Sequence, residues 1–157
     1  MDAPTAPAWY LKLPPPVWTL AMLLCAWLLE RSFDWAGIVY FRSLPLAVIS
    51  ALAGIGLAVW AARTFAAAGT ELNPTSPANK QLVTRGPFRL TRNPMYLGLV
   101  LVSLGIAFYA GTIPFFAVPL LVFLVCNGAF IPFEEAKMQR QFDRQFADYT
   151  RRTRRWL

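Results

Sequence analysis

Histidine is absent from this 157-residue sequence, and charged residues make up only 15% of it. Histidine is the usual base of a Ser-His-Asp triad and a common zinc ligand, so its absence argues against both kinds of site. The sequence also has no G-x-G-x-x-G or Walker motif. The soluble nucleotide-binding loops built on these motifs are therefore excluded. A nucleotide-like cofactor would have to bind by a scheme particular to membrane proteins.

Cysteine is nearly absent as well. The two cysteines, Cys25 and Cys126, both lie inside apolar runs. A free cysteine in an apolar run behaves as a small hydrophobic residue. We therefore expect two small core residues and no disulfide.

Hydrophobic residues are abundant instead, at 57% of the chain, with a mean hydropathy of +0.44. Soluble domains usually contain roughly 45–50%. The length predicts a single domain over residues 1–157, and the composition predicts an integral membrane protein. The formal charge of +7 suits anionic lipid headgroups or an anionic cofactor. Nucleic acid is disfavoured, because the basic residues flank apolar runs and form no single soluble face.

Four apolar segments are long enough to be considered as membrane spans. They cover residues 17–29, 44–60, 95–109 and 113–133. A spanning helix needs about 20 residues, so the first segment is extended back toward Leu11. Residues 110–112 separate the last two segments and predict a tight helical hairpin. The predicted fold is all-α, a polytopic membrane helix bundle with about four transmembrane helices.

The tail from Glu134 onward predicts a C-terminal amphipathic helix. Its larger apolar residues recur at helical spacing and share one face: Met138, Phe142, Phe146 and Tyr149. Such a helix could lie at the membrane interface, or it could close a cytoplasmic cavity.

Lysine and arginine gather in the middle loop, residues 64–93, and in the tail after residue 134. The first hairpin loop carries only Arg31 and Arg42, and the second carries none. Positive residues mark the cytoplasmic side. An even number of spans places both termini, the middle loop and the tail on one side, and we expect that side to be cytoplasmic.

The middle loop ends in Asn93-Pro94, which is a strong helix-start signal. Asparagine caps free N–H groups, and proline fits the first helical position. The start of a helix favours a carboxylate or phosphate, and Arg89 and Arg92 add full positive charges. The alternative is that these arginines only anchor the helix in lipid headgroups.

Glu134 and Glu135 close the fourth apolar segment. Adjacent helical residues point about 100° apart, so the two carboxylates should have different partners. One could pair with Arg92 or Arg89, and the other could accept hydrogen bonds from a ligand. The alternative is a solvated pair bonded to Lys137 or to water.

Two sequence blocks together resemble a known enzyme family. The first is the stretch of residues 82–98, LVTRGPFRLTRNPMYLG; the second contains Glu134-Glu135, Phe142-Asp143, Tyr149 and Arg154-Arg155-Trp156. Their order and spacing are similar to the signature of the isoprenylcysteine carboxyl methyltransferase family. That superfamily also includes phospholipid N-methyltransferases. The resemblance covers roughly the C-terminal half of the chain.

The resemblance implies a methyltransferase that takes S-adenosylmethionine from the cytosol and methylates a hydrophobic, lipid-like acceptor that enters from the bilayer. It implies a bacterial-type inner-membrane enzyme with a cofactor-binding half at about residues 64–157. No metal is expected, because histidine is absent and the carboxylates are scattered. Arg92 and Glu135 would shape the catalytic region. The cofactor would be lined by Lys80, Gln81, Leu82, Val83, Phe88, Asn93, Pro94, Met95, Tyr96 and Glu134. The implied reaction is direct displacement at the sulfonium methyl group, so alignment and exclusion of water are the main tasks.

The chain departs from the family pattern at three places. Asn93 stands where histidine is common, and asparagine cannot titrate as a base near neutral pH. Asp143 stands where a glycine follows the phenylalanine. Residues 130–133 are apolar where prenylcysteine-methylating members are expected to have an arginine, which weakens the case for a carboxylate acceptor.

Two other functions remain as alternatives. A relative of the membrane sterol reductases would have a similar C-terminal half and would bind NADPH. A non-catalytic membrane subunit would use its basic face to bind anionic lipid or a partner.

Overall fold

The computed structural model describes residues 11, 13–33, 41–69 and 81–157. The described residues form helices and connecting segments without a β-strand. In chain order the elements are α1 (Pro15–Ser32), α2 (Leu44–Ala66), the 3-10 turn η2 (Gly86–Arg89), α3 (Pro94–Ala110), α4 (Ile113–Val125), the π-helical turn η3 (Cys126–Phe130) and α5 (Ile131–Arg152). The predicted all-α class is confirmed.

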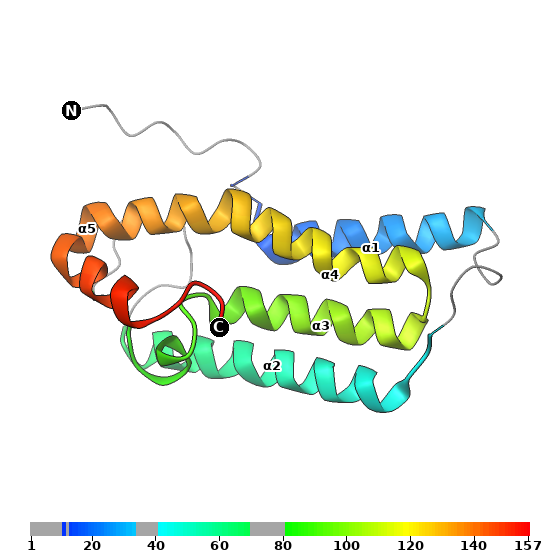
Figure 1. Ribbon diagram of the computed structural model, residues 1–157, viewed down its shortest axis with the longest axis horizontal. Helices are drawn as coiled ribbons and strands as arrows, with labels where there is room; N and C mark the ends of the chain where they lie inside the picture. Colours follow the sequence, from blue (N-terminus) through cyan, green and yellow to red (C-terminus); the bar gives the residue numbers. More distant parts are fainter. Residues whose placement is uncertain (1–10, 12, 34–40, 70–80) are drawn as a thin grey trace.

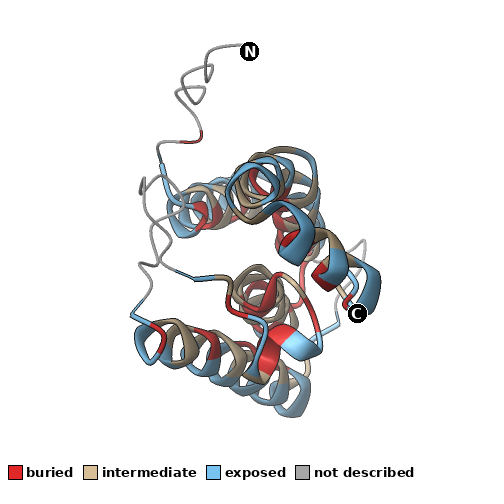
Figure 2. Ribbon diagram, turned by 90° about the vertical axis from the view of Figure 1, so that its left-hand side faces the viewer, coloured by how far each residue is buried: buried red, intermediate tan, exposed pale blue. Residues whose placement is uncertain are grey.

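Helices α1 to α4 lie nearly parallel and form two layers (Figure 1). One layer holds α2 and α3, and the other holds α1 and α4, as the end view in Figure 2 shows. Helix α3 contacts α2, α4 and α1, so it joins the two layers. Many large apolar side chains on α1 and α2 are exposed, as expected of surfaces that face lipid.

Two of the described helices are long and apolar enough to cross a membrane, namely Leu44–Ala66 and the continuous helix Ile113–Arg152. Helix α3, with 17 residues, falls just below the length required. Helix α1 begins at Pro15, so the expected extension back to Leu11 is wrong. Three successive residues, Pro14 to Pro16, favour a helix start at this point because proline fits the first turn.

The predicted hairpin at residues 110–112 is confirmed. Helix α3 ends at Ala110, and Gly111 follows in the left-handed conformation with φ 79°. Its N–H donates to the carbonyl of Ala107 at 2.7 Å. Glycine adopts this conformation without a steric penalty, and the chain can therefore reverse within two residues.

The helix that contains the fourth apolar segment continues past the glutamate pair. It passes from α4 through the π turn η3 into α5, so Glu134 and Glu135 lie in the first turns of a continuing helix. The helix predicted from Glu134 onward is thus the continuation of the apolar segment before it. Their carboxylates do not face the unpaired carbonyl groups of a helix end.

Two clusters of buried residues stabilise the bundle. One lies around α4 and includes Cys126, and the other joins α2, the middle loop and the end of α5. Cys126 is buried as expected, but Cys25 is exposed, which corrects its assignment to the core. An apolar run in a membrane helix contains a lipid-facing side as well as a core-facing side, and hydrophobicity alone does not distinguish them.

Helices α2 and α3 approach closely at glycine positions. A Cβ atom added to Gly54 would lie 2.5 Å from the Gly98 carbonyl oxygen and 2.8 Å from the Val102 nitrogen. Small residues at helix contacts allow this close backbone approach in membranes. The contact holds α2 close to the first half of α3.

Substituting Gly54 with alanine should destabilise the protein by about 1–3 kcal/mol, because the helices would have to move apart. Gly56 is the matched control, since a Cβ atom there meets nothing within 4 Å. Alanine at Gly56 should be neutral or stabilising by up to about 1 kcal/mol through its higher helix propensity. Thermal unfolding of both variants in detergent measures the difference. Equal effects would contradict the close packing.

Candidate active site

A cavity of about 590 Å³ lies among α2, α3, α5, the start of α1 and the middle loop. This volume falls within the roughly 300–1,000 Å³ of small-molecule sites. Its walls differ in chemistry. One end contains the ionisable and polar side chains of Arg92, Tyr96, Glu134 and Glu135, and the other is almost entirely apolar.

The part of the middle loop that reaches the cavity is held in place by the end of α2 and by α5. The Gln81 side chain donates to the Ala68 carbonyl at 2.5 Å. The Phe88 ring packs edge-on against the Phe65 ring, at 4.8 Å between centroids. The Tyr149 hydroxyl donates to the Phe88 carbonyl at 2.7 Å. The end of α5 thus fixes the loop against α2.

Helix α5 reaches this loop because it bends at Asp143. The Asp143 backbone has φ 38° and ψ −107°. Asp143 is the one non-glycine residue with positive φ in the described parts of the chain. The Gln139 side chain donates to the Asp143 carbonyl at 3.3 Å. Beyond the bend, Phe146 and Tyr149 are buried against the loop. The apolar stripe predicted for the tail thus packs on the buried cluster between α2 and the middle loop, with Met138 and Phe142 before the bend and Phe146 and Tyr149 after it.

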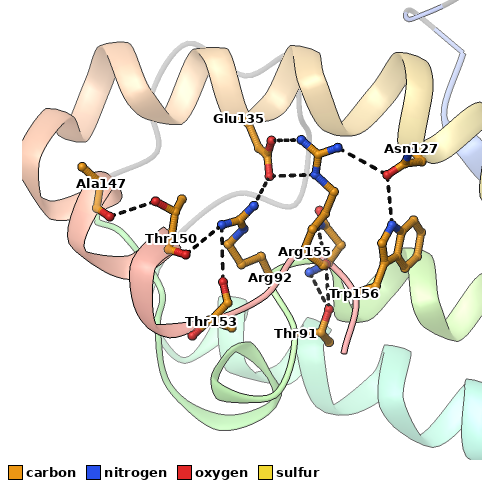
Figure 3. Close-up of polar contacts among 10 residues, drawn as sticks. Thr91, Arg92, Asn127, Glu135, Ala147, Thr150, Thr153, Arg155 and Trp156 are labelled. Carbon is orange, nitrogen blue, oxygen red and sulfur yellow. Dashed lines mark hydrogen bonds and ion pairs between the residues drawn. The ribbon is translucent and has the colours of Figure 1, made fainter.

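Glu135 accepts hydrogen bonds from two arginines (Figure 3). The nearer Arg92 guanidinium nitrogen lies 2.7 Å from Oε1, and an Arg155 nitrogen lies 2.5 Å from Oε2. Arg92 also donates to the carbonyl oxygens of Thr150 and Thr153, each at 3.3 Å. Arg92 is therefore held in a defined position, with 14% of its side chain exposed.

Glu134 has a different partner. Its Oε1 accepts a hydrogen bond from the Tyr96 hydroxyl at 2.5 Å. Tyr96 lies in the first turn of α3, so this bond ties α5 to the start of that helix. The prediction that the two carboxylates have different partners is confirmed, and Glu135 has the predicted partner Arg92. Arg89, the other suggested partner, is exposed.

Asn93 precedes α3 as expected, but its side chain makes no capping hydrogen bond. Its Nδ2 instead donates to the Arg155 carbonyl at 2.9 Å, and its N–H donates to the Thr91 hydroxyl at 3.1 Å. The expected capping role is wrong because the C-terminal residues lie beside Asn93 and provide an acceptor. The first-turn N–H groups of α3 are left without a cap from that side chain.

The structure brings the predicted site residues together. Every one of them except Lys80 lines the cavity, and Lys80 lies outside the described residues. Their placement around a single space is shown, and their roles remain predictions. Gly98, Met138, Phe146 and Tyr149 also line the cavity, and the sequence had placed them in the first motif block or in the apolar stripe of the tail. The lining residues that sequence reasoning missed come from the start of α1, from α2 and from α3: Pro14, Pro15, Pro16, Ile55, Ala58, Val59, Ala62, Phe65, Leu99 and Val102. No local pattern distinguishes these residues from other apolar residues of the same helices.

A family model provides an independent comparison. The model for phospholipid methyltransferases matches residues 43–145, which include α2, α3, α4 and most of the glutamate-bearing helix. The chain belongs to the phospholipid methyltransferase family. No curated protein and no solved structure matched the chain. Membership in this family, together with the apolar helices, identifies a membrane protein of a methyltransferase family that acts on lipid-type substrates.

Replacing Asp143 with glycine should stabilise the protein, because an L-residue at this positive φ costs about 1–3 kcal/mol and glycine does not. Thermal unfolding in detergent should show a higher transition temperature. Asp148 is the matched control, since it is exposed in the regular last turns of α5. Glycine there should destabilise by about 1 kcal/mol. A lower transition temperature for Asp143→Gly would show that the bend is not strained.

Proposed function

We propose that this protein transfers a methyl group from S-adenosylmethionine to a hydrophobic, lipid-like acceptor within the membrane. The observation that carries the proposal is that one cavity joins a charged end to a long apolar wall. A polar cofactor and a lipid-like acceptor can meet only where two such surfaces share one space. The family match favours methyl transfer over the NADPH-dependent reduction considered above.

The donors and acceptors at the charged end fit the polar groups of the cofactor. The first turn of α3, from Pro94 to Tyr96, and the Arg92 guanidinium would hold its carboxylate, since helix starts and arginine both favour anions. Glu134 would accept hydrogen bonds from the ammonium group or the ribose hydroxyls. Leu82, Val83 and Phe88 line the same end and would contact the adenine ring.

When bound, the cofactor supplies an electrophilic methyl group on its sulfonium. The protein aligns the acceptor with this group and excludes water. Both oxygens of Glu135 already accept hydrogen bonds from Arg92 and Arg155. We therefore assign Glu135 to holding Arg92 in place, rather than to carrying a proton.

The acceptor would lie along α2. The apolar wall of the cavity on this side consists of Ile55, Ala58, Val59 and Ala62. Leu99 and Val102 of α3 line the cavity opposite them. About half of the surface of Ile55 and Val59 is exposed, so they stand at the mouth of the cavity. In a membrane this mouth faces lipid, which suits lateral entry of an acyl or prenyl chain.

Four spans in the inner membrane, with both termini cytoplasmic, remain part of the proposal. Helices α1 and α3 have 18 and 17 residues, which lie at the lower end of the roughly 17–25 residues of spanning helices. The arginine-rich loop and tail meet at the same end of the bundle (Figure 1). That end would face the cytosol by the distribution of positive charge.

Purified protein in detergent should bind S-adenosylmethionine in isothermal titration calorimetry, and it should not bind NADPH. Arg92→Ala and Glu134→Ala should each weaken binding about tenfold or more, since hydrogen bonds to charged groups contribute about 1.5–3 kcal/mol. Arg89→Ala is the matched control, because Arg89 belongs to the same loop and is exposed. Binding of NADPH alone would favour a reductase, and binding of neither cofactor in any detergent would overturn the proposed function.

Narrowing the cavity mouth should impair use of the acceptor without changing the affinity for the cofactor. Val59→Trp should lower methyl transfer from radiolabelled S-adenosylmethionine to extracted membrane lipids by about tenfold, because misplacement of a reactant is costly. Affinity for the cofactor should stay unchanged. Leu52→Trp places the same bulk on an exposed part of α2 outside the cavity and serves as the control. Equal activities of the two variants would remove α2 from the acceptor site.

A further inference from the structure

We propose that the C-terminal segment, residues 153–157, positions the cofactor end of the cavity, with Arg155 as the positioning residue. The inference rests on the proposed function and adds to it a part of the chain that the family match does not cover, since the match ends at residue 145. Arg155 does not line the cavity. Arg155 must therefore affect the cavity through the lining residues that it contacts, Glu135 and Asn93.

The first contact is through the side chain. Arg155 donates to both oxygens of Glu135, from Nη2 to Oε2 at 2.5 Å and from Nε to Oε1 at 3.3 Å. Arg92 donates to Oε1 from the cavity side at 2.7 Å. Figure 3 shows the Glu135 carboxylate held between the two guanidinium groups. A two-pronged arginine contact fixes the orientation of a carboxylate as well as its position.

The second contact is through the backbone. The Arg155 carbonyl accepts hydrogen bonds from the Asn93 side chain at 2.9 Å and from the Thr91 hydroxyl at 3.0 Å. The carbonyl of the preceding residue, Arg154, accepts from the Arg92 N–H at 3.0 Å. Thr91 and Asn93 are buried. The segment therefore holds each of the three residues that lead into α3.

The segment is itself anchored on the π turn. Asn127 Oδ1 accepts hydrogen bonds from Arg155 at 3.3 Å and from the Trp156 ring nitrogen at 3.0 Å (Figure 3). The Trp156 ring also packs on Phe123, at 4.7 Å between centroids. A π turn adds a residue to the helical turn and re-aims the side chains within it. The Asn127 side chain in this turn can therefore accept hydrogen bonds from Arg155 and Trp156.

The charges explain why Arg155 matters for Arg92. With Arg155 present, Glu135 is shared between two cations. Without it, Arg92 becomes the remaining arginine on a carboxylate that is 21% exposed, and this partly buried pair would draw Arg92 toward α5. Arg92 would then be less well placed for an anionic group of the cofactor. The loss would appear in cofactor affinity even though Arg155 makes no contact with the cofactor.

The test compares Arg155→Met with Arg152→Met, an exposed arginine in the last turn of α5. Calorimetry with S-adenosylmethionine and thermal unfolding in detergent are measured on each full-length variant. Arg155→Met should bind about tenfold or more weakly, as expected for a displaced binding group. Arg152→Met should bind like the wild type. Arg155→Lys keeps the charge without the two-pronged contact, and its affinity should lie between them.

A double-mutant cycle separates positioning from general stabilisation. Glu135→Gln and Arg155→Met should be non-additive in cofactor affinity, because both act through Arg92. Wild-type affinity in a folded Arg155→Met would overturn the inference, and so would additive effects. If Arg155→Met does not fold, unchanged affinity of Arg155→Lys would also overturn it. Absence of binding by the wild type and by Arg152→Met would instead overturn the proposed function.

Discussion

The carboxylate of Glu135, held between Arg92 and Arg155, is the interaction on which the rest of the site depends. It joins the loop that leads into α3, the first turns of α5 and the C-terminal segment, which are far apart in sequence. A partly buried carboxylate needs charged partners that also satisfy its hydrogen bonds, and two arginines meet that need. Arg92 can face the cavity in a defined position because Arg155 fixes the Glu135 carboxylate to which Arg92 donates.

The cavity itself follows from how the helices pair. Glycines let α2 approach α3 closely, and α1 packs on α4. Helix α5 then bends at Asp143 and closes one end with Phe146 and Tyr149. A charged end and an apolar wall are thereby placed in one space. This is the arrangement that a reaction between a polar cofactor and a lipid-like acceptor requires.

Much of the site could be predicted from local signals. Asn93-Pro94 marks a helix start because proline suits the first turn, and neighbouring glutamates diverge because a helix turns about 100° per residue. Other predictions failed where distant contacts decided the outcome. Asn93 does not cap α3, since the Arg155 carbonyl lies next to it. Cys25 is exposed, because an apolar residue in a membrane helix is compatible with a lipid-facing position as well as a core position.

Hydrophobic runs, prolines and the two motif blocks were enough to predict a helical membrane protein and the residues that line the charged end of its cavity, because these features are visible within short stretches of the chain. The α2 wall, the bend at Asp143 and the role of the last residues depended on packing. An apolar residue carries no mark of whether it faces lipid, a neighbouring helix or a cavity. An arginine near the C-terminus likewise carries no mark of the partly buried carboxylate that it will contact. Those partners are chosen only when the helices come together.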